Sequence, residues 1–67
     1  MERHAQHMLT VLEEGGGLSL QEWNTRARAH GRMGADDVAR TNCYRARKHL
    51  EQQGHVTCGK DGVWRVA

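Results

Sequence analysis

The sequence has 67 residues, of which 37% are hydrophobic and 27% are charged, and its formal net charge is +2 at pH 7. A chain of this length has room for one small domain, which excludes a multidomain enzyme. No apolar run approaches the ~20 residues that a transmembrane helix needs, and the first residues lack a secretory signal pattern, so we expect a cytoplasmic protein without a membrane partner. In that reducing compartment Cys43 and Cys58 are expected to stay thiols.

The charged residues are unevenly distributed along the chain. Residues 1–22 hold one arginine and four glutamates, whereas residues 23–48 hold seven lysines and arginines and two aspartates. The remaining residues, 49–67, are balanced. Positive charge concentrated in the middle of a small domain suits a phosphate-binding surface, but a charged run is about as often a solvated face. The charge distribution alone does not distinguish these two interpretations, so the predicted fold is needed to choose between them.

The first predicted element is an amphipathic helix over residues 2–14. Its apolar side chains recur with helical spacing, at Ala5, Met8, Leu9 and Leu12. Three successive glycines, 15–17, follow and cannot continue a helix cheaply. Because no phosphate-binding loop motif accompanies them, these glycines predict a plain turn.

The second predicted helix begins near Leu20 and ends at His30-Gly31. Ser19 and Glu22 have the spacing of a capping box, in which each side chain accepts a hydrogen bond from the backbone at a helix start. The apolar stripe of this helix consists of Leu20, Trp23 and Ala27. A loop over residues 31–34 separates it from the next helix.

The third predicted helix covers residues 36–53, with Asp36 or Asp37 as its N-cap. Its buried stripe is predicted as Val38 or Ala39, then Cys43, Ala46 and Leu50. The helix is expected to be interrupted near Thr41 and Asn42, because both residues are better caps than interior residues. Four of the ten lysines and arginines of the chain fall on this helix, and Arg45 and Lys48 share its predicted exposed side with Thr41 and Gln52.

The last part of the chain predicts a β-hairpin. Two short alternating segments, 55–58 and 63–66, flank the turn 59–62, which contains an Asp-Gly pair. The side chains expected to face the helices are Val56, Cys58, Trp64 and Val66. Lys60 is expected at the hairpin tip.

Three helices followed by a hairpin predict an α+β fold, a winged helix-turn-helix that spans residues 1–67 as a single domain. In such a fold the third helix can lie in the major groove of DNA while the hairpin, called the wing, reaches the backbone. The basic segment coincides with this third helix. That coincidence favours DNA binding over a merely solvated face.

The stretch from Thr41 to Val56, together with the triplet Trp64-Arg65-Val66, resembles the end of many bacterial and phage winged-helix domains. The resemblance implies DNA binding, in a transcription regulator or in the targeting module of a replication or recombination protein. The stretch from Trp23 to Tyr44 is longer than in such domains, so we expect a longer loop or an extended third helix. A second stretch, Leu18–Arg26, resembles the opening of phage excisionases, which are also small winged-helix proteins.

Individual roles follow from side-chain chemistry. Arg45 can form a bidentate contact with guanine, and Asn42 can form one with adenine. The side chains expected to contact phosphates are Arg40, Thr41, Tyr44, Lys48 and Lys60. Arg47 is expected to pack its stem against the wing. Trp23 and Trp64 are expected in the core, because both lie on apolar faces.

Metal binding and catalysis are weaker alternatives. A zinc site would have to use His49, His55 and Cys58, which lack the paired spacing of zinc ligands. No nucleophile, base and orienting group can be assembled from the motifs present, so we expect neither an enzyme nor a cofactor.

The main alternative is a winged helix that binds protein, as an oligomerisation unit or a docking module without direct DNA contact. The acidic first helix would then be a candidate partner face. Dimerisation through this helix would present two recognition helices to a two-fold DNA site, so a homodimer and a larger assembly both remain open. DNA binding through lysines and arginines weakens steeply as salt rises, which distinguishes it from an apolar protein interface.

Overall fold

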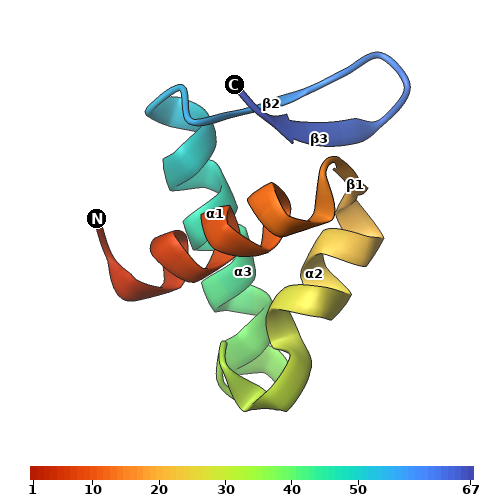
Figure 1. Ribbon diagram of the computed structural model, residues 1–67. Helices are drawn as coiled ribbons and strands as arrows, with labels where there is room; N and C mark the ends of the chain where they lie inside the picture. Colours follow the sequence, from red (N-terminus) through yellow and green to blue (C-terminus); the bar gives the residue numbers. More distant parts are fainter.

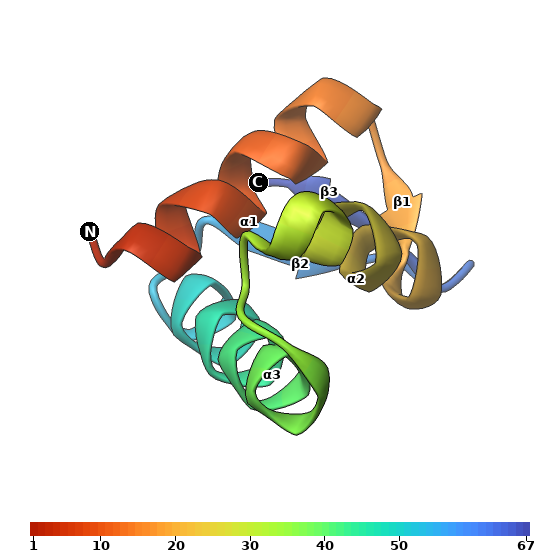
Figure 2. The ribbon, with the colours of Figure 1, turned by 90° about the horizontal axis from the view of Figure 1, so that it is seen from below.

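The computed structural model describes residues 1–67 and contains three α-helices and one three-stranded antiparallel sheet. The helices are α1 (Arg3–Gly15), α2 (Leu20–Arg28) and α3 (Asp36–Gln52), with a short 3-10 helix, η1 (Ala29–Gly31), after α2. The strands are β1 (Leu18–Ser19), β2 (Val56–Cys58) and β3 (Val63–Val66). In Figure 1, α1 crosses in front of α3 and the sheet lies above both, and Figure 2 separates the two helices. The predicted α+β winged-helix layout is confirmed.

The sheet has the strand order β1-β3-β2, so β3 pairs with strands on both sides. The hairpin formed by β2 and β3 was predicted, but no strand was predicted at residues 18 and 19. They form β1, in which Leu18 lies opposite Trp64 of β3. This third strand ties the segment between α1 and α2 to the C-terminal hairpin.

The core contains 14 buried side chains, all of them hydrophobic. Trp23 lies at its centre, with no exposed surface and its ring centroid 5.6 Å from that of Trp64. The indole Nε1–H of Trp23 donates a hydrogen bond of 2.8 Å to the carbonyl of Met8, so its one polar group is satisfied. The prediction that both tryptophans belong to the core is confirmed.

Helix α1 has well-defined ends. The carboxylate of Glu2 accepts hydrogen bonds from the backbone N–H groups of His4 and Ala5, at 3.0 and 3.2 Å. These bonds, led by the one from His4, lower the pKa of Glu2. At the other end Gly16 adopts a left-handed conformation with φ of 68°, and its N–H donates to the carbonyl of Leu12.

The inward face of α1 differs slightly from the predicted stripe. Ala5, Met8 and Leu12 are buried as predicted, but Leu9 is only partly buried. Val11 is buried in addition. The stripe is therefore broader than four positions, because α1 packs against both α2 and α3 and also approaches β3.

Helix α2 begins as predicted and ends slightly early. The hydroxyl of Ser19 accepts a hydrogen bond of 3.2 Å from the backbone N–H of Glu22, which confirms Ser19 as the N-cap. The helix ends at Arg28 and continues as η1, in which His30 has a positive φ of 60°. Trp23 is buried in the predicted stripe, whereas Leu20 at its edge is 37% exposed.

Two predictions about the start and middle of α3 are wrong. Ala35 is the N-cap residue, because its carbonyl accepts the first backbone bonds, and neither Asp36 nor Asp37 forms a side-chain cap. Both aspartates instead lie in the first turn, where their charge complements the helix dipole. The expected interruption near Asn42 is absent, and α3 runs unbroken for 17 residues.

No helix of the chain combines the length and the apolar character needed to cross a membrane.

The hairpin has the predicted strands and turn. Val56 lies opposite Val66, and Cys58 lies opposite Trp64, so these four side chains share one face of the sheet as predicted. Only Val56 and Trp64 are buried, however, since Cys58 and Val66 lie beyond the area that the helices cover. The four-residue turn is closed by a hydrogen bond of 3.0 Å from Gly62 N–H to the carbonyl of Gly59.

Candidate nucleic-acid interface

Helix α3 buries one face and presents the opposite face to solvent. The buried face consists of Ala39, Cys43, Ala46 and Leu50. On the opposite side lies what we call the α3 outer face, made of Asp37, Thr41, Tyr44, Arg45, Lys48 and Gln52, all exposed. Figure 2 shows α3 at one edge of the molecule, on the side away from α1. A helix exposed in this way can enter a groove without moving the rest of the fold.

The basic side chains of α3 fall into two groups. Arg40, Arg45 and Lys48 are exposed and take part in none of the four ion pairs of the chain. Arg47, in contrast, is paired with Glu51. Unpaired cations can meet phosphate groups without first breaking an internal ion pair. The structure thus brings the predicted residues Thr41, Tyr44, Arg45 and Lys48 together on the α3 outer face, and Arg40 is exposed on the same helix outside that face.

Arg47 connects α3 to the wing. Its guanidinium carbon lies 5.3 Å from the centroid of the Tyr44 ring and 5.4 Å from that of Trp64, distances at which a cation is attracted to an aromatic face. Its Nη1 atom is 3.8 Å from Oε1 of Glu51, and the side chain is only 16% exposed. The prediction that Arg47 packs against the wing is confirmed. This residue therefore forms a direct contact between α3 and the wing.

Asn42 is not placed as a base-reading residue. Its Nδ2 donates a hydrogen bond of 2.8 Å to the carbonyl of Met33, and the residue is partly buried. A bidentate contact with adenine needs the amide to face the groove, whereas this amide faces the turn before α3. Since the amide bonds to that turn and not to its own helix, it also does not interrupt α3. We therefore leave Asn42 out of the candidate interface.

A shallow hollow of about 300 Å³ opens on the N-terminal half of α3, lined by Asp37, Val38, Thr41, Asn42 and Arg45. Val38 is 60% exposed, although valine is a core-forming residue. The sequence left open whether Val38 or Ala39 belongs to the buried stripe, and Ala39 takes that position. Exposed Val38 was not among the predicted site residues. Its helical spacing from Arg45, seven residues on, is the signal that could have revealed it.

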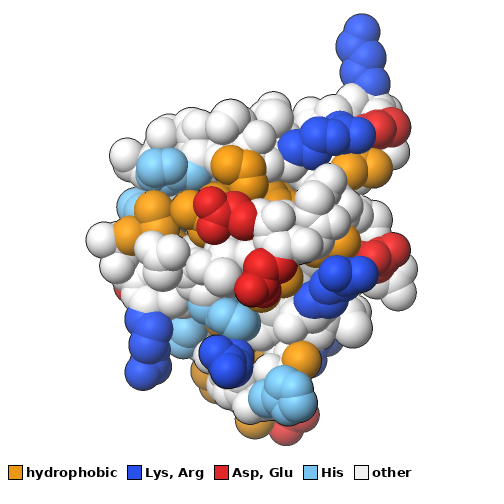
Figure 3. Space-filling model, viewed as in Figure 1, with side chains coloured by type: hydrophobic (Ala, Val, Ile, Leu, Met, Phe, Trp, Pro, Cys, Tyr) orange, Lys and Arg blue, Asp and Glu red, His pale blue; other side chains and the backbone are white.

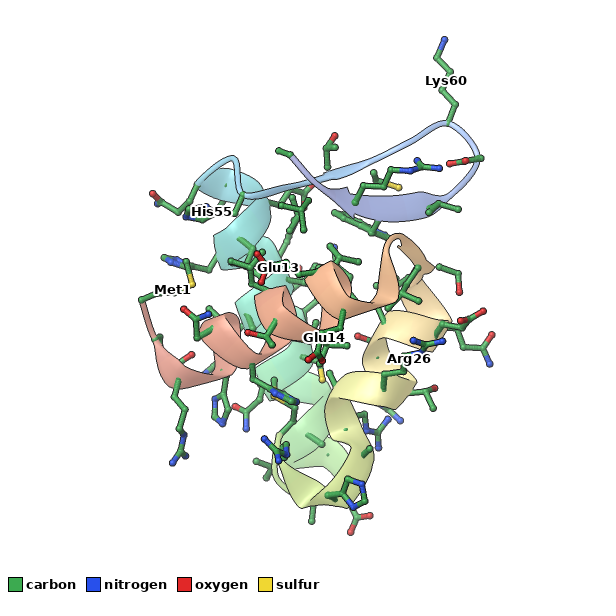
Figure 4. All side chains as sticks on the ribbon, in the orientation of Figure 1. Met1, Glu13, Glu14, Arg26, His55 and Lys60 are labelled. Atoms are coloured by element: carbon green, nitrogen blue, oxygen red, sulfur yellow. The ribbon has the colours of Figure 1, made fainter.

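The wing carries one free cation at its tip. Lys60 projects away from the rest of the molecule in Figure 4. The neighbouring Asp61 accepts hydrogen bonds of 3.0 Å from the guanidinium of Arg65 and from the backbone N–H of Val63. The bond from Arg65 is the main cause of the lowered pKa of Asp61. Because Asp61 neutralises Arg65, Lys60 is the cation that the wing can offer to a phosphate.

Arg28, at the end of α2, is a basic residue that the sequence did not assign to the site. It is exposed, forms no ion pair and lies close enough to α3 for its charge to act on the Cys43 thiol. Burial nevertheless raises the pKa of Cys43. In the sequence Arg28 lies outside the apolar stripe of Leu20, Trp23 and Ala27, and its proximity to α3 depends on how α2 and α3 pack.

The face that carries α1 has a different character. In Figure 3, Lys and Arg side chains on this face are interspersed with carboxylates and histidines. Glu13, Glu14 and Arg26 all belong to it, and Arg26 is paired with Glu22 at 3.6 Å. Charges of both signs mixed in this way do not build the continuous positive potential that a phosphate backbone requires.

The histidines and cysteines do not assemble into a metal centre. No group of three His, Cys, Asp or Glu side chains is positioned to hold a metal ion, so His49, His55 and Cys58 do not come together. Cys43 is buried and Cys58 is exposed, and both are free thiols.

The largest pocket, about 420 Å³, is an open space between the start of α1 and α3, next to His4 and His49.

Comparison with protein-family models, with curated protein sequences and with solved structures gives no match for this chain. The case for a function therefore depends on the residues of the α3 outer face and the wing.

Proposed function

We propose that this chain binds double-stranded DNA, with α3 in the major groove and the β2–β3 wing against the sugar-phosphate backbone. The observation that supports this most strongly is the set of unpaired, exposed cations on one helix, Arg40, Arg45 and Lys48. In helix-turn-helix proteins the recognition helix occupies the position that α3 has in this fold. A protein with such a surface gains affinity by releasing the counterions condensed on DNA.

Each side chain has a proposed role. Arg45 is the candidate for a bidentate contact with the O6 and N7 atoms of guanine, because its planar guanidinium matches that edge. The contacts to phosphates are assigned to Arg40, Thr41, Tyr44, Lys48 and, on the wing, Lys60. These phosphate contacts set the position of the helix on the duplex, and Arg45 supplies sequence information.

The resemblance of residues 41–56 to bacterial and phage winged-helix domains supports the same proposal. It favours a cytoplasmic transcription regulator, or the DNA-targeting module of a replication or recombination protein. The proposed role requires binding and no chemical step, so we propose neither an enzymatic activity nor a cofactor.

The test is a titration of the chain into a fluorescent mixed-sequence duplex at about 50 and about 200 mM salt. If about four phosphates are neutralised, the affinity falls about a hundredfold between these conditions. Absence of binding by the folded chain at the lower salt would contradict the proposal, as would binding that does not respond to salt. Either result would favour a protein partner, for which exposed Val38 and Tyr44 on the same helix are the candidate contacts.

A further inference from the structure

Val38 is an apolar side chain in an otherwise polar hollow. It is 60% exposed at the N-terminal end of α3, where Thr41 and Arg45 also line the hollow. The other large exposed apolar side chain of this helix, Tyr44, is already engaged with the Arg47 guanidinium. The isopropyl group of Val38 has no comparable partner on the solvent side.

The side chain of Val38 is held in one conformation in the unbound chain. A β-branched side chain in a helix has one strongly preferred χ1 rotamer. Beneath it lies Gly34, where an added Cβ would be 3.0 Å from Cγ1 of Val38, so the valine packs directly over the turn. The hydrogen bond from Asn42 to Met33 holds that same turn. The side chain of Val38 is therefore held rigidly, and binding a partner to its exposed part costs little entropy.

The residue next to Val38 in the chain makes a base edge a better partner for it than a phosphate. Asp37 lines the same hollow, and its negative charge disfavours a phosphate group beside Val38. In the major groove the only apolar group at a base edge is the C5 methyl of thymine. Residues near the start of a recognition helix are those that reach base edges.

We infer that Val38 is a specificity-determining residue that contacts the C5 methyl group of a thymine. This inference rests on the proposed DNA-binding function. Val38 precedes Arg45 by seven residues, or about 10 Å along the helix axis, which corresponds to about three base pairs. The contacted thymine therefore lies within about three base pairs of the guanine that Arg45 contacts.

The test begins with selection of a preferred duplex from a random pool by the unmodified chain. Each thymine of that duplex is then replaced, one at a time, by deoxyuridine, which removes the methyl group and leaves the hydrogen-bonding groups unchanged. Binding is measured for the unmodified chain, for Val38→Ala and for Val66→Ala. Val66 is a matched control because it is also an exposed valine but lies on β3.

One replacement is expected to weaken binding of the unmodified chain about fourfold, the value that corresponds to burying one methyl group. Val38→Ala abolishes the difference between thymine and deoxyuridine at that position, whereas Val66→Ala preserves it. A duplex that is bound equally well with every thymine replaced would overturn the inference and leave DNA binding intact. So would a Val38→Ala variant that remains sensitive to the methyl group, or a chain that binds DNA but selects no preferred duplex. A folded chain that binds no DNA would overturn both the inference and the proposed function.

Discussion

The two longest helices, α1 and α3, pack against each other and against the same core, but they contribute to it differently. From α1 the core receives Met8, Val11 and Leu12, whereas α3 supplies mainly small residues, with Leu50 as its one large aliphatic side chain. Their outer faces differ as well, since cations and carboxylates are mixed around α1 but unpaired cations predominate on α3. The comparison teaches that the buried face of α3 contributes to the core together with α1, while the α3 outer face takes no part in packing and is free to serve binding.

The largest effect is expected from Trp23→Ala. This substitution removes the central core side chain and its hydrogen bond to Met8, at a cost of about 3–5 kcal/mol. Because a domain of this size has a total stability of only ~3–10 kcal/mol, the variant should lose its cooperative thermal transition. Circular dichroism during heating measures this.

Lys48→Ala is the matched control for that experiment, because Lys48 is exposed and lies on the α3 outer face. Its unfolding free energy should stay within ~0.5 kcal/mol of that of the unmodified chain. If Trp23→Ala melts like the unmodified chain, or if Lys48→Ala unfolds, the proposed separation of stability from binding is wrong.

The two thiols provide a second comparison, between the buried face of α3 and the sheet. Burial raises the pKa of Cys43, whereas Cys58 is exposed on β2. A disulfide reagent at neutral pH should react rapidly with Cys58, and at least about a hundredfold more slowly with Cys43, which requires opening of the core. The reaction is followed with Cys43→Ser and Cys58→Ser variants separately. If Cys43 and Cys58 react at equal rates in the folded chain, the buried face of α3 is accessible to the reagent and the account of the core is wrong.

The contact between α3 and the wing is tested by Arg47→Met combined with Glu51→Gln. This pair of changes removes an ion pair and leaves the net charge unaltered, while methionine keeps an unbranched stem. If the Arg47 contact holds the wing in place for DNA binding, the double variant should lose the phosphate contact assigned to Lys60. The salt dependence of its DNA affinity should then correspond to about one phosphate contact fewer. Adding Lys60→Ala to this variant should then have little further effect. A full additional loss on adding Lys60→Ala would show that the wing contacts DNA without Arg47.

The smallest effect is expected at the wing tip. The pKa of Asp61 is lowered in the folded chain, mainly by its bond to Arg65, so the carboxylate contributes stability above its unfolded pKa of about 4. That contribution disappears as pH falls through the lowered folded value. Asp61→Asn should therefore be slightly less stable than the unmodified chain at pH 7, and equally stable at about pH 2. A difference that persists at about pH 2 would assign the effect to packing instead of charge.

Much of the fold is predictable because its signals are local. Helical spacing of apolar residues, the Ser19 cap and the glycines after α1 identified the helices to within a few residues. Strand β1 escaped prediction, since two residues are too few to show alternation and its partner strand lies at the other end of the chain. Met33 is completely buried although it lies in a predicted loop, because the turn folds back onto the core.

The candidate site was predictable where it depended on charge and not where it depended on packing. The position of Arg45 and Lys48 on one exposed face follows from helical periodicity alone. The hydrogen bond from Asn42 to Met33 depends on the path of the loop before α3, which no local pattern specifies. For the same reason the exposure of Val38 and the proximity of Arg28 to α3 became visible only in the folded chain.

The central claim is that the α3 outer face is the DNA-binding surface, and the most direct test compares two double variants of equal charge. Arg45→Ala with Lys48→Ala removes two cations from α3, whereas Arg3→Ala with Arg32→Ala removes two exposed, unpaired cations that line a hollow beside α1. DNA affinity is measured by fluorescence anisotropy at about 50 mM salt, with folding checked by circular dichroism. We expect the α3 variant to lose at least about tenfold in affinity and the other to stay within about threefold of the unmodified chain. Equal losses in both variants would show that diffuse positive charge, and not α3, binds the DNA.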